Sequence, residues 1–283
     1  MRDRRPSTSL WLRSGVARGV DPASHHLLRR AMDGRRWPVI LMYHAIDPPG
    51  RWSGWRWAVS DDDFRRQLDL LARYAIRTVR LSDVVGAQDT SVVITFDDGY
   101  ADNHRYALSA LVERGQVATW FIPGDRVGRS ADWVAAEGEE RPLMDGSQLH
   151  DLLQAGMEIG GHGCTHRDLT TLSDGELERE VVIGRRALEE RIGCALPTFA
   201  YPFGLHDDRV RRAVAAAGYR YACTTRPGWW GSDSDPLQLR RVAIFGGDSL
   251  STFARKLAFA DTEVSWRKMA RYYRRRLLDR LAR

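Results

Sequence analysis

Two adjacent acidic residues, Asp97 and Asp98, stand at the end of an apolar run in the segment T-F-D-D-G-Y, residues 95–100. The three residues before this segment are Val, Val and Ile, which predicts a buried strand that ends in the two carboxylates. Neighbouring acids cannot both be buried and ionised unless a cation or hydrogen-bond donors compensate them. The pair is therefore either solvated, in a turn built on Asp-Gly, or part of a metal site.

Two histidines, His162 and His166, are separated by three residues in the segment G-G-H-G-C-T-H, residues 160–166. This segment also follows an apolar run, Met-Glu-Ile at 157–159. Two imidazoles at this spacing can converge on one cation, and imidazole suits a borderline transition metal. Together with the acidic strand end they can complete a set of two imidazoles and one carboxylate that leaves coordination positions open. Taken alone, a histidine pair of this spacing more often has a structural role.

A third strand end has the sequence F-A-Y-P-F-G, residues 199–204. An aromatic-Pro-aromatic-Gly turn of this kind can present a backbone N–H toward an oxyanion, and the rings of Tyr201 and Phe203 can wall a pocket. A simple structural turn is the alternative.

The elements around these strand ends alternate from residue 37 onward between short apolar runs and segments of helical period, which predicts an α/β fold with largely parallel strands. The seven candidate strands are 39–44, 92–98, 118–122, 157–162, 198–202, 219–225 and 239–245. The five candidate helices are 61–74, 102–114, 147–155 capped by Ser147, 173–192 with a capping box of Ser173 and Glu176, and 207–217. This order predicts a barrel-like single domain whose chemistry lies at the carboxyl ends of its strands.

The net charge of +6 in this chain of 283 residues is carried by its two ends. Residues 1–36 hold nine basic and three acidic residues and residues 267–283 hold eight basic and one acidic, so the segment between them is net acidic. No nucleic-acid recognition motif accompanies the basic ends, and nucleic-acid binding is therefore not expected. Three cysteines without a C-x-x-C pair predict a reducing compartment.

The C-terminal residues 262–283 have the pattern of a basic amphipathic helix. Its apolar positions recur at helical spacing: Val264, Trp266, Ala270, Tyr273, Leu277 and Leu281. Such a helix lies on an anionic membrane surface, docks on an acidic partner, or packs against the acidic body of its own chain. No apolar run long enough to span a membrane or to form a signal peptide is present, so a cytoplasmic location is expected, with contact to a membrane surface left open.

The three motifs, in this order and spacing, resemble those of the polysaccharide deacetylases with a NodB-homology domain, carbohydrate esterase family 4. The resemblance covers about residues 37–247 and implies a distorted (β/α)7 barrel that removes acetyl groups from N-acetylated sugars with a divalent metal, most often zinc. The chain then divides into a basic N-terminal arm, 1–36, a NodB-like deacetylase domain, 37–261, and the basic amphipathic helix, 262–283. The sugar, the polymer length and the oligomeric state are not predicted.

The resemblance also implies roles for individual residues. Asp98, His162 and His166 correspond to metal ligands, and Asp97 corresponds to the general base that deprotonates the water on the metal. The backbone N–H of Phe203 corresponds to the group that stabilises the oxyanion.

The chain departs from the better-known members in the residue that protonates the leaving amine. Those members supply an acid histidine near the end of the domain, whereas no histidine follows His206 and the expected place has the sequence I-F-G-G-D, residues 244–248. The strand V-I-L-M-Y-H at 39–44 resembles the first strand of permuted relatives that act on extracellular poly-N-acetylglucosamine, which makes His44 the candidate acid. The alternative is a histidine that only forms a hydrogen bond at a strand end.

Two further departures concern residues that support the site. Gly163 stands where many members carry a Ser or Thr that braces the loop between the two histidines, and Ala200 stands where many carry an arginine that orients the base. Arg241 is predicted to contact Asp97 instead; the alternative is that Arg240 and Arg241 form surface ion pairs.

Tryptophans near the strand ends are either packing residues or sugar-stacking platforms. They are Trp52, Trp55, Trp57, Trp229 and Trp230. Three function classes remain open: a metal-dependent deacetylase acting on an acetamido sugar, a hydrolase of another C–N amide bond, and a carbohydrate-binding relative with little turnover.

Overall fold

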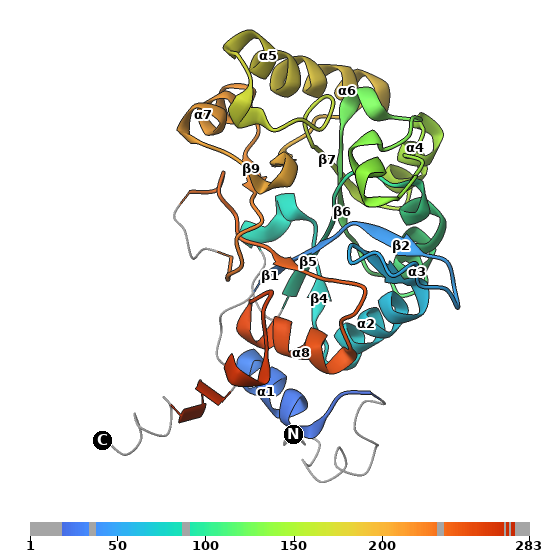
Figure 1. The fold of residues 1–283 in the computed structure, drawn as a ribbon, viewed down its shortest axis with the longest axis vertical. Coiled ribbons are helices and arrows are strands. Elements are labelled where there is room, and N and C mark those ends of the chain that lie inside the picture. Colours follow the sequence, from blue (N-terminus) through green and yellow to red (C-terminus); the bar gives the residue numbers. More distant parts are fainter. Residues whose placement is uncertain are drawn as a thin grey trace, which may run out of the picture.

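A curled sheet of parallel strands forms the centre of the molecule, with helices around it (Figure 1). The computed structural model describes residues 19–33, 38–86, 91–230, 235–268, 270–271 and 273–274. In these residues the strand order is β10-β1-β5-β6-β7-β8-β9, with β4 paired to β5. The strands of this sheet are β1 Val39–Tyr43, β4 Arg77–Thr78, β5 Ser91–Phe96, β6 Thr119–Ile122, β7 Glu158–Gly161, β8 Thr198–Ala200, β9 Tyr221–Cys223 and β10 Val242–Ala243.

The sheet confirms the predicted α/β class and the seven predicted strands, and it adds β4, whose two polar residues carry no apolar signal. Every pairing is parallel, and β1, β5, β6 and β7 are buried along their whole length because helices cover the sheet. The predicted strand 239–245 is shorter than expected. Its first part forms a single bridge from Leu239 to Cys223 of β9, and Val242–Ala243 pair with β1, so the barrel is closed there by one bridge.

The register of the strands places the chemical groups together. Tyr43 of β1 pairs with Phe96 of β5, so the next residues, His44 and Asp97, leave the sheet beside each other at its carboxyl edge. The Asp97 N–H donates to the Tyr43 carbonyl over 3.0 Å, which continues this pairing by one residue. Strand β7 ends one residue before His162 and pairs with β8.

The helices agree with the predicted ranges but differ in detail. They are α2 Asp61–Arg73, α3 Ser109–Val112, α4 Gly146–Gln154, α5 Asp174–Glu178, α6 Gly184–Ile192 and α7 Asp208–Ala216. The predicted Ser147 cap of α4 is wrong, because Asp145 caps this helix. The Asp145 carboxylate accepts from the Gln148 N–H, and the Asp145 N–H donates to the Gln148 side-chain oxygen. The capping box of Ser173 and Glu176 is confirmed.

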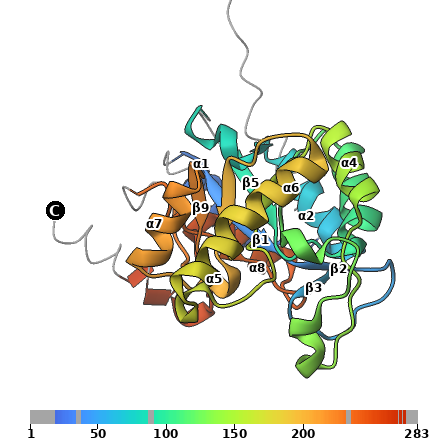
Figure 2. The ribbon, with the colours of Figure 1, turned by 90° about the horizontal axis from the view of Figure 1, so that it is seen from above.

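The predicted helix 173–192 contains a wide turn. Residues Arg179–Ile183, labelled η6, form a π-helical segment between α5 and α6. Seen from above, α6 lies between α4 and α7 (Figure 2), and it contacts both β7 and the segment Gly124–Arg126. A second π-helical segment, Asn103–Leu108, precedes α3. Wide turns of this kind are frequent at functional sites.

Two helices that the sequence analysis did not predict pack against each other at one end of the molecule (Figure 1). They are α1 Pro22–Asp33, which lies within the predicted N-terminal arm, and α8 Leu250–Phe259. Leu27 and Leu28 of α1 are buried, and Leu28 belongs to the hydrophobic core, so the described part of the arm packs as part of the domain.

The predicted C-terminal helix lies mostly outside the described residues. In the part that is described, residues 266–268, 270–271 and 273–274 are helical, and the Trp266 side chain is 61% exposed with the Arg255 guanidinium over its ring. None of the described helices has the length and apolarity needed to cross a membrane.

Candidate active site

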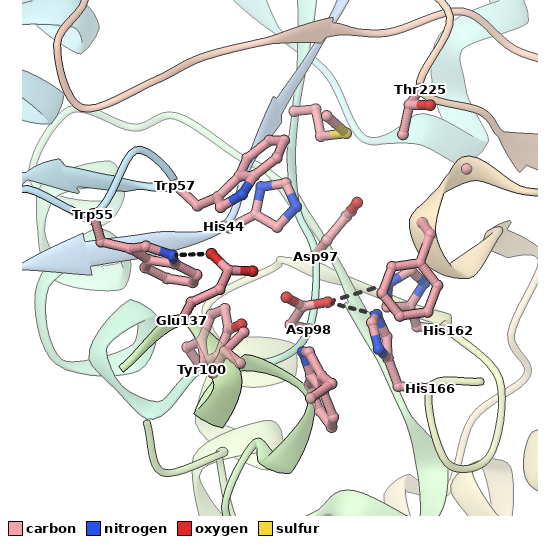
Figure 3. Close-up of a pocket in the computed structure, with 15 residues that line it drawn as sticks. His44, Trp55, Trp57, Asp97, Asp98, Tyr100, Glu137, His162, His166 and Thr225 are labelled. Atoms are coloured by element: carbon pink, nitrogen blue, oxygen red, sulfur yellow. Dashed lines mark hydrogen bonds and ion pairs between the residues drawn. The ribbon is translucent and has the colours of Figure 1, made fainter. Parts of the chain in front are cut away.

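Three buried side chains meet where the carboxyl ends of β5 and β7 come together. Asp98 follows β5, His162 follows β7, and His166 ends the loop between the histidines. Asp98 Oδ1 lies 3.3 Å from His162 Nε2 and 3.1 Å from His166 Nε2 (Figure 3). The three ligand atoms lie within 4.8 Å of one another, in the one such cluster that the described residues contain. The structure thus brings together the three residues that the sequence singled out as metal ligands.

The backbone orients one candidate ligand. His162 Nδ1 donates to the carbonyl oxygen of Ala200 over 2.7 Å, which leaves Nε2 as the nitrogen that faces Asp98. The His166 ring stacks on Trp133 at a centroid distance of 4.3 Å and meets the edge of Phe203 at 4.6 Å. Burial acts to raise the pKa of Asp98, but His166 and His162 outweigh it and hold this pKa well below its usual value.

Three non-glycine residues of the site adopt a left-handed backbone conformation. The φ angle is 72° at Asp98, 63° at His166 and 58° at Phe203. Such conformations cost of order 1–3 kcal/mol each and persist only where the surrounding structure imposes them, most often at functional sites. The strain therefore indicates that the positions of these side chains are under tight structural control.

The donor set fits a divalent transition metal. Two imidazole nitrogens and one carboxylate oxygen converge from one side, which is the composition of catalytic zinc sites that keep positions open for water or substrate. The Asp98 carboxylate is only 5% exposed and has no basic side chain other than the two histidines as a partner among the described residues. A bound cation would compensate this buried charge.

The second carboxylate of the motif, Asp97, is held by Arg241. Arg241 Nη1 and Nη2 donate to Asp97 Oδ1 and Oδ2 over 2.6 and 2.8 Å, and Arg241 Nε donates to the Thr224 carbonyl over 3.0 Å. The predicted contact between Arg241 and Asp97 is therefore present, and the alternative of a surface ion pair is wrong because Arg241 is 0% exposed. Burial acts to raise the pKa of Asp97, and the Arg241 charge more than offsets this and lowers it.

His44 lies on the same cavity as the two carboxylates. Its ring points toward Asp97 from the side opposite His162 and His166 (Figure 3) and lies 4.5 Å from the Trp57 ring. His44 Nδ1 is buried without a hydrogen-bond partner among the described residues. The alternative role, a structural histidine that forms a hydrogen bond at the strand end, therefore has no such bond at this atom. Burial lowers the pKa of His44, against the opposing effect of Asp98 and Asp97.

The cavity has a volume of about 250 Å³, and its lining includes the aromatic side chains of Trp55, Trp57, Tyr100, Trp133 and Phe203. Trp55 and Trp57 come from the loop between β2 (Ala45–Asp47) and β3 (Ala58–Ser60), whereas Trp133 and Glu137 come from the segment Asp132–Glu137. The Trp55 indole N–H donates to the Glu137 carboxylate over 2.7 Å and joins the two walls (Figure 3).

Of the tryptophans near the strand ends, Trp55 and Trp57 line the cavity, while Trp52, Trp229 and Trp230 do not. Sequence analysis missed Trp133 and Glu137, because they lie in a long connection with no motif that marks them.

The two aromatic residues of the third motif behave differently. Phe203 is 54% exposed and lines the cavity from the turn Pro202–Gly204. Tyr201, which was predicted to wall the pocket, is buried away from it: its hydroxyl donates to the Leu237 carbonyl over 3.0 Å, and its ring stacks on His206. Tyr201 thus supports the turn from behind.

Comparison with known proteins agrees with this geometry. Residues 85–222 match the family model described as polysaccharide deacetylase. The provisionally named polysaccharide deacetylase YxkH of Bacillus subtilis (strain 168) is 27% identical over 76% of this chain and 74% of its own length. The chitooligosaccharide deacetylase of Sinorhizobium fredii (strain NBRC 101917 / NGR234) is 30% identical over 54% of this chain and 61% of its own length. A solved polysaccharide deacetylase from Bacillus cereus superposes with a TM-score of 0.66 at 25% identity, over 77% of this chain and 68% of that one.

Proposed function

Because the chain belongs to the polysaccharide deacetylase family through residues 85–222, we propose that it is a metal-dependent hydrolase that removes N-acetyl groups from an acetamido sugar, as a polysaccharide or a glycolipid intermediate. One observation carries the proposal. The three candidate metal ligands, an ionised carboxylate held by Arg241 and a histidine with an unpartnered buried nitrogen all face one cavity. These are the groups that amide hydrolysis by an activated water requires.

Asp98, His162 and His166 are the proposed ligands of a divalent metal, with Zn²⁺ as the first candidate because of the two imidazoles. When bound, such a metal lowers the pKa of a coordinated water and polarises an amide carbonyl. The Ala200 carbonyl keeps the proton of His162 on Nδ1, so that Nε2 remains available as a ligand. Trp133 and Phe203 hold the His166 ring from two sides.

Asp97 is the proposed general base. Arg241 fixes the orientation of its carboxylate and keeps it ionised, while the carboxylate still lines the cavity where the attacking water would lie. A positioned base of this kind accelerates proton transfer by about 10²–10⁴-fold. The N–H of Phe203, at the left-handed turn, is the proposed donor to the developing oxyanion.

His44 is the proposed general acid for the leaving amine. It enters the cavity from β1, on the side of Asp97 away from the two histidine ligands, so one bound amide can lie between the base and the acid (Figure 3). The aromatic side chains of Trp57 and Trp133 line the cavity and offer faces for a sugar ring to stack on.

A hydrolase of a non-sugar amide would use the same groups, and a carbohydrate-binding relative would keep the same walls. The arrangement of Asp97 favours catalysis over binding alone, since metal binding requires only Asp98 of the two acids. Acetate release from a panel of N-acetylated mono- and oligosaccharides, after chelation and again after addition of Zn²⁺, separates the three classes. Release that depends on metal and is lost in Asp97→Asn supports the proposal. Release from non-sugar acetamides alone, or from none of the panel, would refute it.

A further inference from the structure

The loop between the two histidines, residues 163–165, is short and carries no bracing side chain at Gly163. It nevertheless holds His166 in a left-handed conformation next to Asp98. On one side its carbonyl groups are held by the backbone of another segment. The Gly124 N–H donates to the Gly163 carbonyl over 3.0 Å, and the Asp125 N–H donates to the Cys164 carbonyl over 2.9 Å.

On its other side the loop is held by one buried carboxylate, Glu180. Glu180 Oε2 accepts from the Cys164 N–H over 2.8 Å and from the Thr165 N–H over 2.9 Å, while Oε1 accepts from the Thr165 hydroxyl. The side chain is 3% exposed and has no basic partner among the described residues. Burying an ionised carboxylate costs free energy unless hydrogen-bond donors compensate it, and here the loop supplies all three donors.

The wide turn η6 places this carboxylate. Glu180 is the second residue of the π-helical segment Arg179–Ile183. Gly184 directly follows the end of this segment. A Cβ atom on Gly184 would lie 3.0 Å from Cys164 Cα, tighter than an ordinary contact, so a glycine here lets the helix approach the loop this closely. A Cβ atom on Gly163 would lie 3.0 Å from Glu180 Oε2. The carboxylate thus occupies the space beside Gly163.

We propose that Glu180 is the positioning residue of the metal site and performs the bracing that a Ser or Thr at position 163 provides in many relatives. It acts through the peptide groups of Cys164 and Thr165, which set the direction in which His166 leaves the loop. This inference rests on the proposed metal-dependent function. Groups that orient metal ligands from behind typically contribute 10–100-fold to metal affinity.

The test compares four variants of the full chain with the wild type. Glu180→Ala removes all three hydrogen bonds, Glu180→Gln retains an oxygen that accepts from the two N–H groups, and Thr165→Val removes only the hydroxyl bond. Glu178→Gln, an exposed position two residues earlier, is the matched control. Zn²⁺ affinity is measured by competition with a chromophoric chelator, and the ligand geometry is measured from the visible absorption of bound Co²⁺.

Glu180→Ala is expected to bind Zn²⁺ about 10–100-fold more weakly and to change the Co²⁺ spectrum, with Glu180→Gln and Thr165→Val between it and the wild type. The control is expected to match the wild type. Wild-type affinity and an unchanged Co²⁺ spectrum in Glu180→Ala would overturn the proposal, even if that variant unfolds at a lower temperature in chelator. If Glu180→Ala does not fold, the same wild-type behaviour in both Glu180→Gln and Thr165→Val overturns it. A wild type that binds neither metal would overturn the proposed function as well, which distinguishes the two failures.

Discussion

Replacement of Arg241 tests how the buried carboxylate of Asp97 is held. The two side chains share two hydrogen bonds of 2.6 and 2.8 Å, and Arg241 is 0% exposed. Removing one partner of such a pair leaves a buried charge without compensation and costs about 3–5 kcal/mol. Arg241→Met is therefore expected to lower the free energy of unfolding by that amount, out of a total of about 5–15 kcal/mol for a typical domain.

Arg241→Lys separates the charge from its geometry. A lysine retains a positive charge but cannot grip both carboxylate oxygens as the planar guanidinium does. The expected loss of stability is smaller, about 1.5–3 kcal/mol for a hydrogen bond to a charged group. Acetate release is nevertheless expected to fall on the order of 100-fold in kcat, because the proposed base is no longer held in position.

A double-mutant cycle with Asp97→Asn measures the coupling directly. Each single replacement leaves a buried charge, whereas the double variant Asp97→Asn with Arg241→Met leaves none, so a coupling free energy of about 2–3 kcal/mol is expected. Urea unfolding in the presence of chelator gives the free energies without a contribution from bound metal. Arg220→Met, at an exposed arginine, is the control and is expected to change stability by no more than about 0.5 kcal/mol. Additive single effects, or an Arg241→Lys variant with wild-type stability and kcat, would refute the reasoning.

Three further replacements test other parts of the structure. His44→Ala is expected to retain Zn²⁺ affinity but to lose about 10²–10⁴-fold in kcat, measured by acetate release, and wild-type turnover would remove His44 from the mechanism. Gly163→Ala is expected to lower the free energy of unfolding by about 1–2 kcal/mol in urea, because Gly163 has a φ of 74° and a Cβ would press on Glu180; unchanged stability contradicts this. Burial acts to raise the pKa of Asp21, but Ser24, Ser251 and Arg255 outweigh burial and lower this pKa to about 2. The contribution of the ionised Asp21 to the free energy of unfolding is therefore present above about pH 4 and is lost as the pH falls toward 2. The deficit of Asp21→Asn in urea, about 1 kcal/mol after allowance for partial exposure, is therefore expected to shrink from about pH 5 to about pH 3, and a constant deficit would count against it.

The sequence was sufficient to locate the candidate metal ligands, because each lies in a short local motif at a strand end. Asp98, His162 and His166 follow apolar runs whose burial is easily predicted, and the carboxyl ends of parallel strands meet at one edge of the sheet. For such residues local pattern and topology together are enough to place the side chain. His44 was predicted instead from the resemblance of its strand to the first strand of permuted relatives, and this strand pairs with that of Asp97.

The residues that the sequence did not reveal are those placed by long connections or by packing. Trp133 and Glu137 reach the cavity from a 3₁₀ segment with no periodic signal. Their role follows from the stacking of Trp133 on His166 and from the contact between Glu137 and Trp55. Glu180 belongs to a segment whose helical period is regular, so the wide turn that points it at the loop has no sequence signature. Helix α1 was not predicted, because the arginines of this segment made it resemble a polar arm. The helix nevertheless packs on α8.

The three departures from the family pattern have a common physical explanation. The proposed reaction requires an oriented base, a braced loop between the histidines and a proton donor. More than one element of the fold can reach each of these positions. Ala200 carries no guanidinium, and Arg241, which directly precedes β10, contacts Asp97 instead. Gly163 carries no hydroxyl, and Glu180 of η6 contacts the loop instead. His44 enters the cavity from β1, which pairs with β10. The acid histidine of the better-known family members is expected just after β10. Substitution at a motif position therefore does not imply a lost function when a neighbouring element delivers the same group to the same place.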